Sequence, residues 1–441
     1  MKTRHMASLL LLAVFLCQAP LRASAQEKNK SKDRERFSGV YELSPGMFAY
    51  IQPMQGAGEK LAYYDDAGQI RELSPLSENI FSAGRGLYLP TPVELKITFI
   101  RNSKGRVTGM ILHRNGLSDT TARKVALYRR EEVRFRDAEI ALAGTLLIPS
   151  GKGRHPAIVL THGTGPEDRN NVLPLVHFLV PHGIAILGYD KRGVGESTGD
   201  WRSASLENLA DDAVAAVQYL KSRNDIDPYR IGVLGASQGG WVAPLAASKS
   251  ASIAFVISVS GPGITPAELT SERLEHDLRT KGFSENEIAD ALALMKLRDD
   301  FARGKESWET LQAAAEKSKG MKWFQYVPMP PTKENYLNDH WPRILDYDPE
   351  PVLESLHVPV LALFGALDDR VFPQQNSDKW REALRKGGNK DYTIKIFPSA
   401  NHMLLKAKTG EMDEYPSLTH FIPGYAPLLL NWLRDRGIAS K

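Results

Sequence analysis

From residue 136 onward, short apolar runs alternate with amphipathic helical patterns, and this alternation most constrains the fold. The runs are rich in branched residues and lie at 157–161, 184–189, 231–234, 255–259, 360–364 and 393–397. Helical patterns lie at 172–181, 204–224, 238–248, 375–386 and 423–435. Buried strands connected by helices are typical of parallel sheets. The pattern predicts an α/β fold, with a mostly parallel sheet covered by helices on both faces.

One long gap interrupts this rhythm between the apolar runs at 255–259 and 360–364. A structureless loop of about 100 residues is implausible inside a compact domain. Helical patterns fill much of the gap, at 266–281, 285–303 and 307–319, and Ser284 with Glu287 forms a Ser-x-x-Glu capping box. We therefore expect the domain at 136–441 to carry a helical cap, at about 264–350, over the carboxyl edge of its sheet.

Residues 37–135 have a different, β-rich texture. Alternation of apolar and polar residues is clearest at 93–99, and turn signals such as Asn115-Gly116 separate the strand-like stretches. We expect a small antiparallel sheet or a partly closed barrel. This region resembles small lipocalin-like β-modules and carries no catalytic motif. A packing or oligomerisation role is favoured over a binding role.

The first 25 residues have the pattern of a secretory signal peptide. A basic start is followed by an apolar run at 9–17 and by Ala-Ser-Ala at 23–25. The run is shorter than the roughly 20 residues that a membrane span needs. A buried N-terminal helix is the alternative, and lipid attachment at Cys17 is disfavoured because large residues precede it. The sequence predicts export to the periplasm or the extracellular space.

Removal of this segment changes the charge and cysteine content. The full chain has a net charge of +4 and one cysteine, but residues 1–25 hold that cysteine and three basic residues with no acid. The remaining chain has a net charge of +1 and no thiol. Nucleic acid and acidic membrane surfaces are therefore not expected as partners. The charged stretch at 26–36 is expected to be a linker.

A G-x-S-x-G motif, GASQG at 235–239, is the strongest chemical signal in the chain. An apolar strand precedes it and a helical pattern follows it, which is the setting of a nucleophile elbow. Glycines flank Ser237 because the strained turn leaves no room for larger neighbours. The motif predicts Ser237 as a nucleophile.

A serine nucleophile needs a general base, and the base needs an orienting acid, in the chain order Ser, acid, His. The histidines after Ser237 are His276, His340, His357, His402 and His420. His402 lies in a loop directly after a predicted strand, where the base belongs. Asp368 and Asp369 both follow the strand before it, and we favour Asp368 as the acid. The other carboxylate then pairs with Arg370 or caps the turn.

Backbone amides must also stabilise the negative charge that develops on the substrate. One donor is expected from Gln238, the residue after the nucleophile. The second is expected from Thr164 or Gly163, in the loop after the run at 157–161. His162 precedes Ser237 in the chain and is expected to hold this loop rather than to act as a base.

Three motifs together resemble the α/β-hydrolase superfamily, and within it a bacterial group of serine esterases. They are HGTGPEDR at 162–169, DKRGVGES at 190–197 and GASQGG at 235–240. The resemblance covers some two thirds of the chain, about 136–438, and implies the fold and a serine hydrolase activity. The cap sequence matches no pattern of that group. The β-rich region is too short for a β-propeller, which argues against a close relative of prolyl oligopeptidase.

The resemblance also implies Ser237, Asp368 and His402 as the catalytic triad. No cofactor and no metal are expected, because the segment 190–197 lacks the G-x-G-x-x-G register and no Cys–His cluster is present. We expect an exported carboxylesterase acting on a small-molecule ester. A peptidase or amidase, a hydrolase of thioesters or lactones, and a non-catalytic binding protein are the alternatives. No pattern specifies the acyl length or the oligomeric state.

Overall fold

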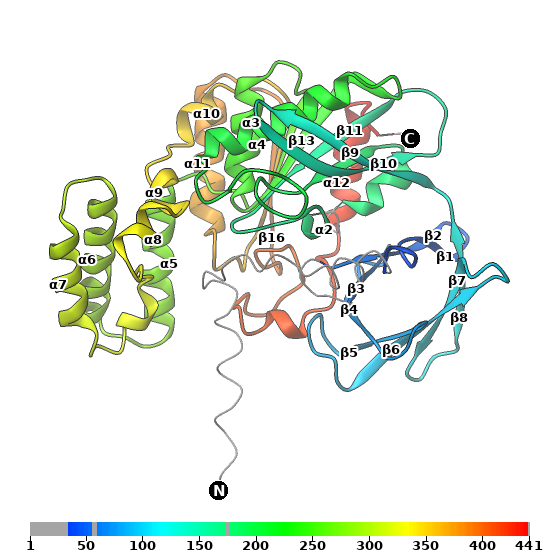
Figure 1. Ribbon diagram of the computed structural model, residues 1–441, viewed down its shortest axis with the longest axis horizontal. Helices are drawn as coiled ribbons and strands as arrows, with labels where there is room; N and C mark the ends of the chain where they lie inside the picture. Colours follow the sequence, from blue (N-terminus) through cyan, green and yellow to red (C-terminus); the bar gives the residue numbers. More distant parts are fainter. Residues whose placement is uncertain (1–33, 55–59, 173–175, 440–441) are drawn as a thin grey trace, which may run out of the picture. The chain divides into compact units, whose positions relative to one another are not determined.

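The computed structural model describes residues 34–54, 60–172 and 176–439 (Figure 1). The predicted signal peptide at 1–25 and most of the predicted linker at 26–36 lie outside the described residues. The chain divides into two compact units. One comprises the residues up to Val125 together with Glu411–His420, and the other comprises Ala126–Gly410 and the residues from Phe421.

The first unit contains a closed antiparallel barrel, which in the described part of the chain has eight strands (Figure 1). They are β1 (Gly39–Ser44), β2 (Met47–Pro53), β3 (Leu61–Asp65), β4 (Ile70–Pro75), β5 (Ile80–Gly84), β6 (Val93–Arg101), β7 (Val107–Arg114) and β8 (Thr120–Val125). Each strand pairs with the next, and β1 pairs with β8. The expected antiparallel arrangement is confirmed, and the barrel is fully rather than partly closed.

Aromatic side chains fill the core of this barrel. In β6, Leu95, Ile97 and Phe99 are buried while the residues between them are more exposed, as the alternation predicted. The ring centroid of Phe99 lies 4.5 Å from that of Phe37 and 5.6 Å from that of Phe81. Small barrels are commonly filled by their inward side chains in this way.

A distant segment, Glu411–His420, also belongs to the barrel unit. Leu87 donates its amide to the carbonyl of Leu418 over 2.7 Å, and Ile70 donates to Thr419 over 2.8 Å. The guanidinium of Arg71 donates to the same carbonyl of Thr419 over 2.9 Å. The predicted domain at 136–441 therefore does not include all of these residues, because Glu411–His420 belongs to the unit of the barrel.

The second unit contains a mixed sheet with the order β16-β15-β14-β13-β11-β12-β10-β9 across the described residues (Figure 1). The strands are β9 (Tyr128–Asp137), β10 (Ile140–Pro149), β11 (His155–Thr161), β12 (Ala185–Tyr189), β13 (Ile226–Ala236), β14 (Phe255–Val259), β15 (Val360–Gly365) and β16 (Tyr392–Phe397). Strands β11 to β16 are parallel, and β9 and β10 are antiparallel. The predicted mostly parallel sheet is confirmed.

The boundary between the units differs from the one predicted at 135/136. Strand β9 pairs along its whole length with β10, so it belongs to the second sheet, and the units divide after Val125. Polar and apolar residues alternate in β9 much as they do in the barrel strands, so the local pattern gives no sign of the change.

Helices cover both faces of the second sheet. They are α2 (Arg169–Val172), η3 (His177–His182), α3 (Leu206–Lys221), α4 (Gly239–Lys249), α11 (Pro373–Lys386) and α12 (Tyr425–Asp435). The short helix η5 (Tyr415–Ser417) belongs to the unit of the barrel. In β11, Ala157 and Val159 pack with α3, α4 and α11, whereas Ile158 and Leu160 pack with η3 and α12. Successive strand residues point to opposite faces, which explains the continuous apolar runs.

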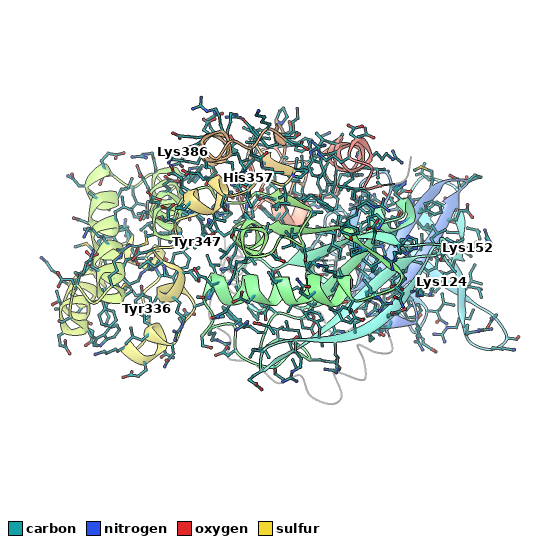
Figure 2. All side chains as sticks on the ribbon, turned by 90° about the horizontal axis from the view of Figure 1, so that it is seen from above. Lys124, Lys152, Tyr336, Tyr347, His357 and Lys386 are labelled. Atoms are coloured by element: carbon teal, nitrogen blue, oxygen red, sulfur yellow. The ribbon has the colours of Figure 1, made fainter. Side chains whose placement is uncertain are left out.

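The long gap between β14 and β15 contains the helices α5 (Pro266–Thr280), α6 (Glu285–Ala302), α7 (Trp308–Ser318), η4 (Phe324–Tyr326), α8 (Lys333–Leu337), α9 (Trp341–Ile344) and α10 (Glu350–Glu354). The helices from α5 to α8 share an apolar core of their own, whereas Ile344 of α9 and Leu353 of α10 belong to the core of the sheet. Three of them match predicted helices, and Ser284 and Glu287 form the predicted capping box. Tyr336 lies within this group, and Lys386 of α11 forms ion pairs with Glu350 and Glu354 of α10 (Figure 2).

Within 34–54, 60–172 and 176–439, no helix combines the length and the hydropathy that a membrane crossing requires.

Candidate active site

The residues predicted to carry chemistry follow the carboxyl ends of neighbouring parallel strands. Ser237 follows β13, Asp368 lies in the turn after β15, and His402 lies in the loop after β16. Strands β13, β14, β15 and β16 are adjacent and parallel, so their ends share one edge of the sheet. This edge is where open α/β sheets place their sites.

Ser237 occupies a strained turn between β13 and α4. Its φ is 55°, in the left-handed region that residues with a side chain rarely adopt. A Cβ at Gly235 would lie 1.9 Å from the carbonyl oxygen of Gly239, so only glycine fits there. The amide of Ser237 donates to the carbonyl of Val259 over 3.0 Å. The turn therefore has the geometry of the predicted nucleophile elbow.

His402 and Asp368 are joined by a hydrogen bond. His402 Nδ1 lies 2.8 Å from Asp368 Oδ2, and the side chain of Asp368 has no exposed area. The other carboxylate oxygen of Asp368 accepts the amides of Arg370 and Val371, each over 2.8 Å. These bonds fix the carboxylate in one orientation and satisfy its buried oxygens.

The neighbouring carboxylate has a different partner. Asp369 accepts two hydrogen bonds from the guanidinium of Arg370, at 3.0 and 2.8 Å. Of the two aspartates that the sequence left open, the structure brings Asp368 to His402 and gives Asp369 to Arg370.

The loop that carries His402 is anchored to the strand beside it. Ser260 follows β14 and donates its hydroxyl to the carbonyl of His402 over 2.8 Å. Asn401 accepts the amides of Met403 and Leu405, each over 3.0 Å. Among the residues that the structure describes, no hydrogen bond joins Ser237 and His402. Such bonds are often long in unliganded enzymes.

The two amides left open for the second oxyanion donor differ in their surroundings. Gly163 already donates its amide to Glu167 Oε2 over 2.7 Å. Thr164 is exposed, and in the described part of the chain its amide donates to no protein group. The N–H of Gly163 is thus occupied in this structure, whereas that of Thr164 is open among the described residues.

His162 anchors the loop that carries Thr164. Its Nε2 lies 2.6 Å from the carbonyl of Tyr189. Burial lowers the pKa of His162 to about 3, so the ring is neutral and this nitrogen carries the proton. The predicted anchoring contact is present.

The DKRGVGES segment ties neighbouring loops together. Asp190 accepts the guanidinium of Arg169 at 2.9 and 2.7 Å, and both residues are buried. Arg192 donates to Asp212 of α3 at 2.7 and 2.9 Å. Burial raises the pKa of Asp212 to about 6, against the opposing effect of Arg192. Gly193 and Gly195 have φ of 76° and 56°, the left-handed backbone that suits glycine in a tight turn.

Sequence reasoning missed two residues at this edge. Lys191 and His340 are both buried and both contact the side chain of Gln238. A lysine directly after a buried strand was the one available signal for the first. His340 was considered only as a possible base and set aside because of its place in the insertion.

Comparison with known proteins was made with this geometry in hand. A model of the Alpha/beta hydrolase family matches residues 158–411. The chain belongs to the alpha/beta hydrolase family. The match covers the elbow, the Asp368 turn and the His402 loop, and leaves the barrel strands outside it.

Two curated proteins are similar to parts of this chain. Esterase EstD of Thermotoga maritima is 27% identical over 274 residues, which cover 60% of this chain and 59% of EstD. Quorum-quenching protein AidA of Acinetobacter baumannii is 30% identical over 128 residues, covering 29% of this chain and 42% of AidA. The chain thus spans about three fifths or less of these two proteins.

Solved structures resemble the hydrolase at low identity. Alpha/beta hydrolase GrgF from Penicillium sp. sh18 is 21% identical with a TM-score of 0.45, covering 70% of this chain and 97% of its own. Esterase Pf2001 of Pyrococcus furiosus is 16% identical with a TM-score of 0.43, covering 70% of this chain and 93% of its own.

Proposed function

We propose that this protein is a serine esterase that hydrolyses carboxylic esters through an acyl-enzyme on Ser237. The observation that carries the proposal is the buried carboxylate of Asp368 held 2.8 Å from His402 Nδ1, at the sheet edge that also bears the Ser237 elbow. A buried acid, a histidine and a strained serine on three strand ends form the arrangement that activates a hydroxyl.

In this mechanism Asp368 accepts the Nδ1–H of His402 and leaves Nε2 free to accept a proton. The Oγ of Ser237 attacks the ester carbonyl as its proton passes to that Nε2. The tetrahedral intermediate collapses when the bond to the leaving oxygen breaks and His402 returns the proton to the alcohol. Water then attacks the acyl-enzyme by the same route, which releases the acid and restores Ser237.

The negative charge of the intermediate is assigned to the amides of Gln238 and Thr164. Gln238 begins the turn into α4, whose N-terminus is directed at the same point, and the amide of Thr164 is available in the facing loop. Preorganised donors of this kind are worth ~3 kcal/mol each to the transition state.

We also assign the helical insertion as a cap beside this edge. Gln375 after β15 donates to Glu272 of α5 over 2.7 Å, and the rings of Phe372 and His276 lie 5.2 Å apart. These contacts connect α5 to the residues that follow the Asp368 turn. Contacts of α5 with this turn suit a cap that shapes substrate entry.

Esters are preferred to amides as the substrate class because a curated relative that matches 60% of this chain is called an esterase. We further propose that the chain is exported, on the basis of the basic and apolar pattern of its first 25 residues.

The test compares p-nitrophenyl acetate, butyrate and octanoate with aminoacyl-p-nitroanilides, using Ser237→Ala as the control. We expect ester turnover and labelling of Ser237 by a fluorophosphonate, both lost in Ser237→Ala. Full ester turnover by Ser237→Ala would refute the mechanism, and faster cleavage of the anilides would replace the esterase with an amidase. A chain that cleaves neither substrate and resists the probe would be a binding protein.

A further inference from the structure

Lys191 is a buried cation at the end of β12 that the proposed chemistry does not use. Only 1% of its surface is exposed. Its ammonium group donates to the carbonyls of Gly163 over 2.8 Å and Gly165 over 3.0 Å, and to Oε1 of Gln238 over 3.1 Å. An ammonium has three donors, and these contacts occupy all of them.

The contacts continue from Gln238 into the helical insertion. Because Oε1 of Gln238 accepts from Lys191, its Nε2 must donate to His340 Nε2, which lies 2.8 Å away. The proton of the ring is then on Nδ1, which donates to the carbonyl of Ala204 over 2.8 Å. Every donor and acceptor direction in this chain of bonds is determined. Burial also lowers the pKa of His340 to about 4, which keeps the ring neutral.

The ring of Trp201 completes the enclosure. Lys191 Nζ lies 5.4 Å from the centroid of this indole, and the indole packs edge-on against His340 at 6.0 Å. Gln238 and His340 are 2% and 3% exposed. Buried networks of this kind hold one arrangement when every member is satisfied.

The position of Lys191 relates directly to the two proposed oxyanion donors. Gly163 and Gly165 flank Thr164, and the third contact of the ammonium is to Gln238. Lys191 therefore holds the backbone on both sides of Thr164, which is one proposed donor. It also holds the side chain of Gln238, whose amide is the other proposed donor. Its three donors are used, so it acts on the amides and not on the substrate.

We propose that Lys191 is a positioning residue that fixes the spacing of the oxyanion donors, and that His340 couples this spacing to the helical insertion. The inference rests on the proposed esterase function. It deepens that function by assigning the alignment of the transition-state site to a lysine and a histidine outside the triad.

The variant Lys191→Met tests the proposal, with Lys152→Met as a matched control on the exposed surface (Figure 2). We expect Lys191→Met to lower kcat for p-nitrophenyl butyrate about 100-fold with little change in KM, as loss of an oxyanion donor does. Affinity for butylboronic acid, which forms a tetrahedral adduct on serine, should fall in parallel. Lys152→Met should change neither. A folded Lys191→Met that keeps its kcat and its boronate affinity would overturn the proposal.

A second measurement uses the unaltered protein. Burial lowers the pKa of Lys191 to about 8, although the negative charges of Glu167 and Asp212 act in the opposite direction. The rings of His162 and His340, which also face the ammonium group, are neutral. Loss of a proton leaves the amine one donor short, so kcat should fall above about pH 8 while KM and circular dichroism stay constant. A fall of kcat over this pH range that is equally large in Lys191→Met would show that another group titrates, and would overturn the proposal.

Ser237→Ala is assayed beside these variants to separate the two claims. If Ser237→Ala retains ester turnover, the proposed function fails. If Ser237→Ala is inactive while Lys191→Met is folded and fully active, the function stands and the positioning role of Lys191 fails.

Discussion

At the scale of single residues, two adjacent aspartates have acquired different partners. Asp368 holds His402 from a fully buried position, whereas Asp369 pairs with Arg370. We expect Asp368→Asn to lower kcat about 10³- to 10⁴-fold, because an amide cannot hold the same histidine tautomer. Asp369→Asn should lower the melting temperature instead and leave most of the kcat. Steady-state kinetics and thermal melts of the two variants, side by side, check this; equal loss of kcat in both would contradict it.

The burial of Lys191 gives a second prediction at this scale, about stability. Its pKa in the folded protein is about 8, below the ordinary value of 10.5. Between these two pH values the unfolded chain binds more protons, so the contribution of Lys191 to stability rises with pH. Urea unfolding at pH 7 and 9.5 should show this rise in the unaltered protein and not in Lys191→Met. The effect runs opposite to the expected loss of kcat above about pH 8. A rise of equal size in both proteins would contradict the assignment.

At the scale of elements, one contact of the insertion with the sheet edge is made by an imidazole. His340 lies just before α9 and is bonded to both Gln238 and Ala204. We expect His340→Asn to lower kcat about tenfold, a smaller loss than for Lys191→Met, because the ammonium still holds Gln238 and the loop.

The double variant of His340 and Lys191 separates this coupling from independent effects. If the two side chains act through one network, the loss of kcat in the double variant should be less than the product of the single losses. Strict multiplication of the two effects would show that His340 and Lys191 act separately.

The elements at the site were predictable because their signals are local. The elbow at Ser237 requires a strand, small neighbours and a helix in succession, and a Cβ at Gly235 has no room. His402 and Asp368 each follow a strand directly, so chain order alone placed them on the right edge. Lys191 could not be assigned in this way. Its partners lie 26 to 47 residues away, and a lysine after a strand is usually exposed.

At the scale of the whole molecule, the division into units was less predictable. Strands β3, β4 and β5 are short and carry little alternation, so the sequence indicated a β-rich region without all of its strands. The assignment of Glu411–His420 to the barrel had no local sign at all. Pairing between distant segments depends on the residues of both segments, and the sequence pattern of one segment does not identify the other.

Gly86 provides a test of that long-range pairing. A Cβ at Gly86 would lie 2.2 Å from the carbonyl oxygen of Pro416, which is backbone and cannot move aside cheaply. We expect Gly86→Val to lower the melting temperature and to speed hydrogen exchange at the amides of Ile70 and Leu87, which donate to this segment. Gly320→Ala is the control, since its methyl group meets nothing within 4 Å. Unchanged exchange in Gly86→Val would contradict the pairing.

The bond from Arg71 to Thr419 spans 348 residues of sequence. The barrel strands come before the other described strands in the chain. Arg71 in β4 nevertheless gains its partner Thr419 only when residue 419 has been synthesised. All strands of the second sheet lie between these two points of the chain. Contacts between residues that lie so far apart in sequence slow folding. The barrel unit therefore gains its contact with Thr419 only after most of the second unit has been synthesised.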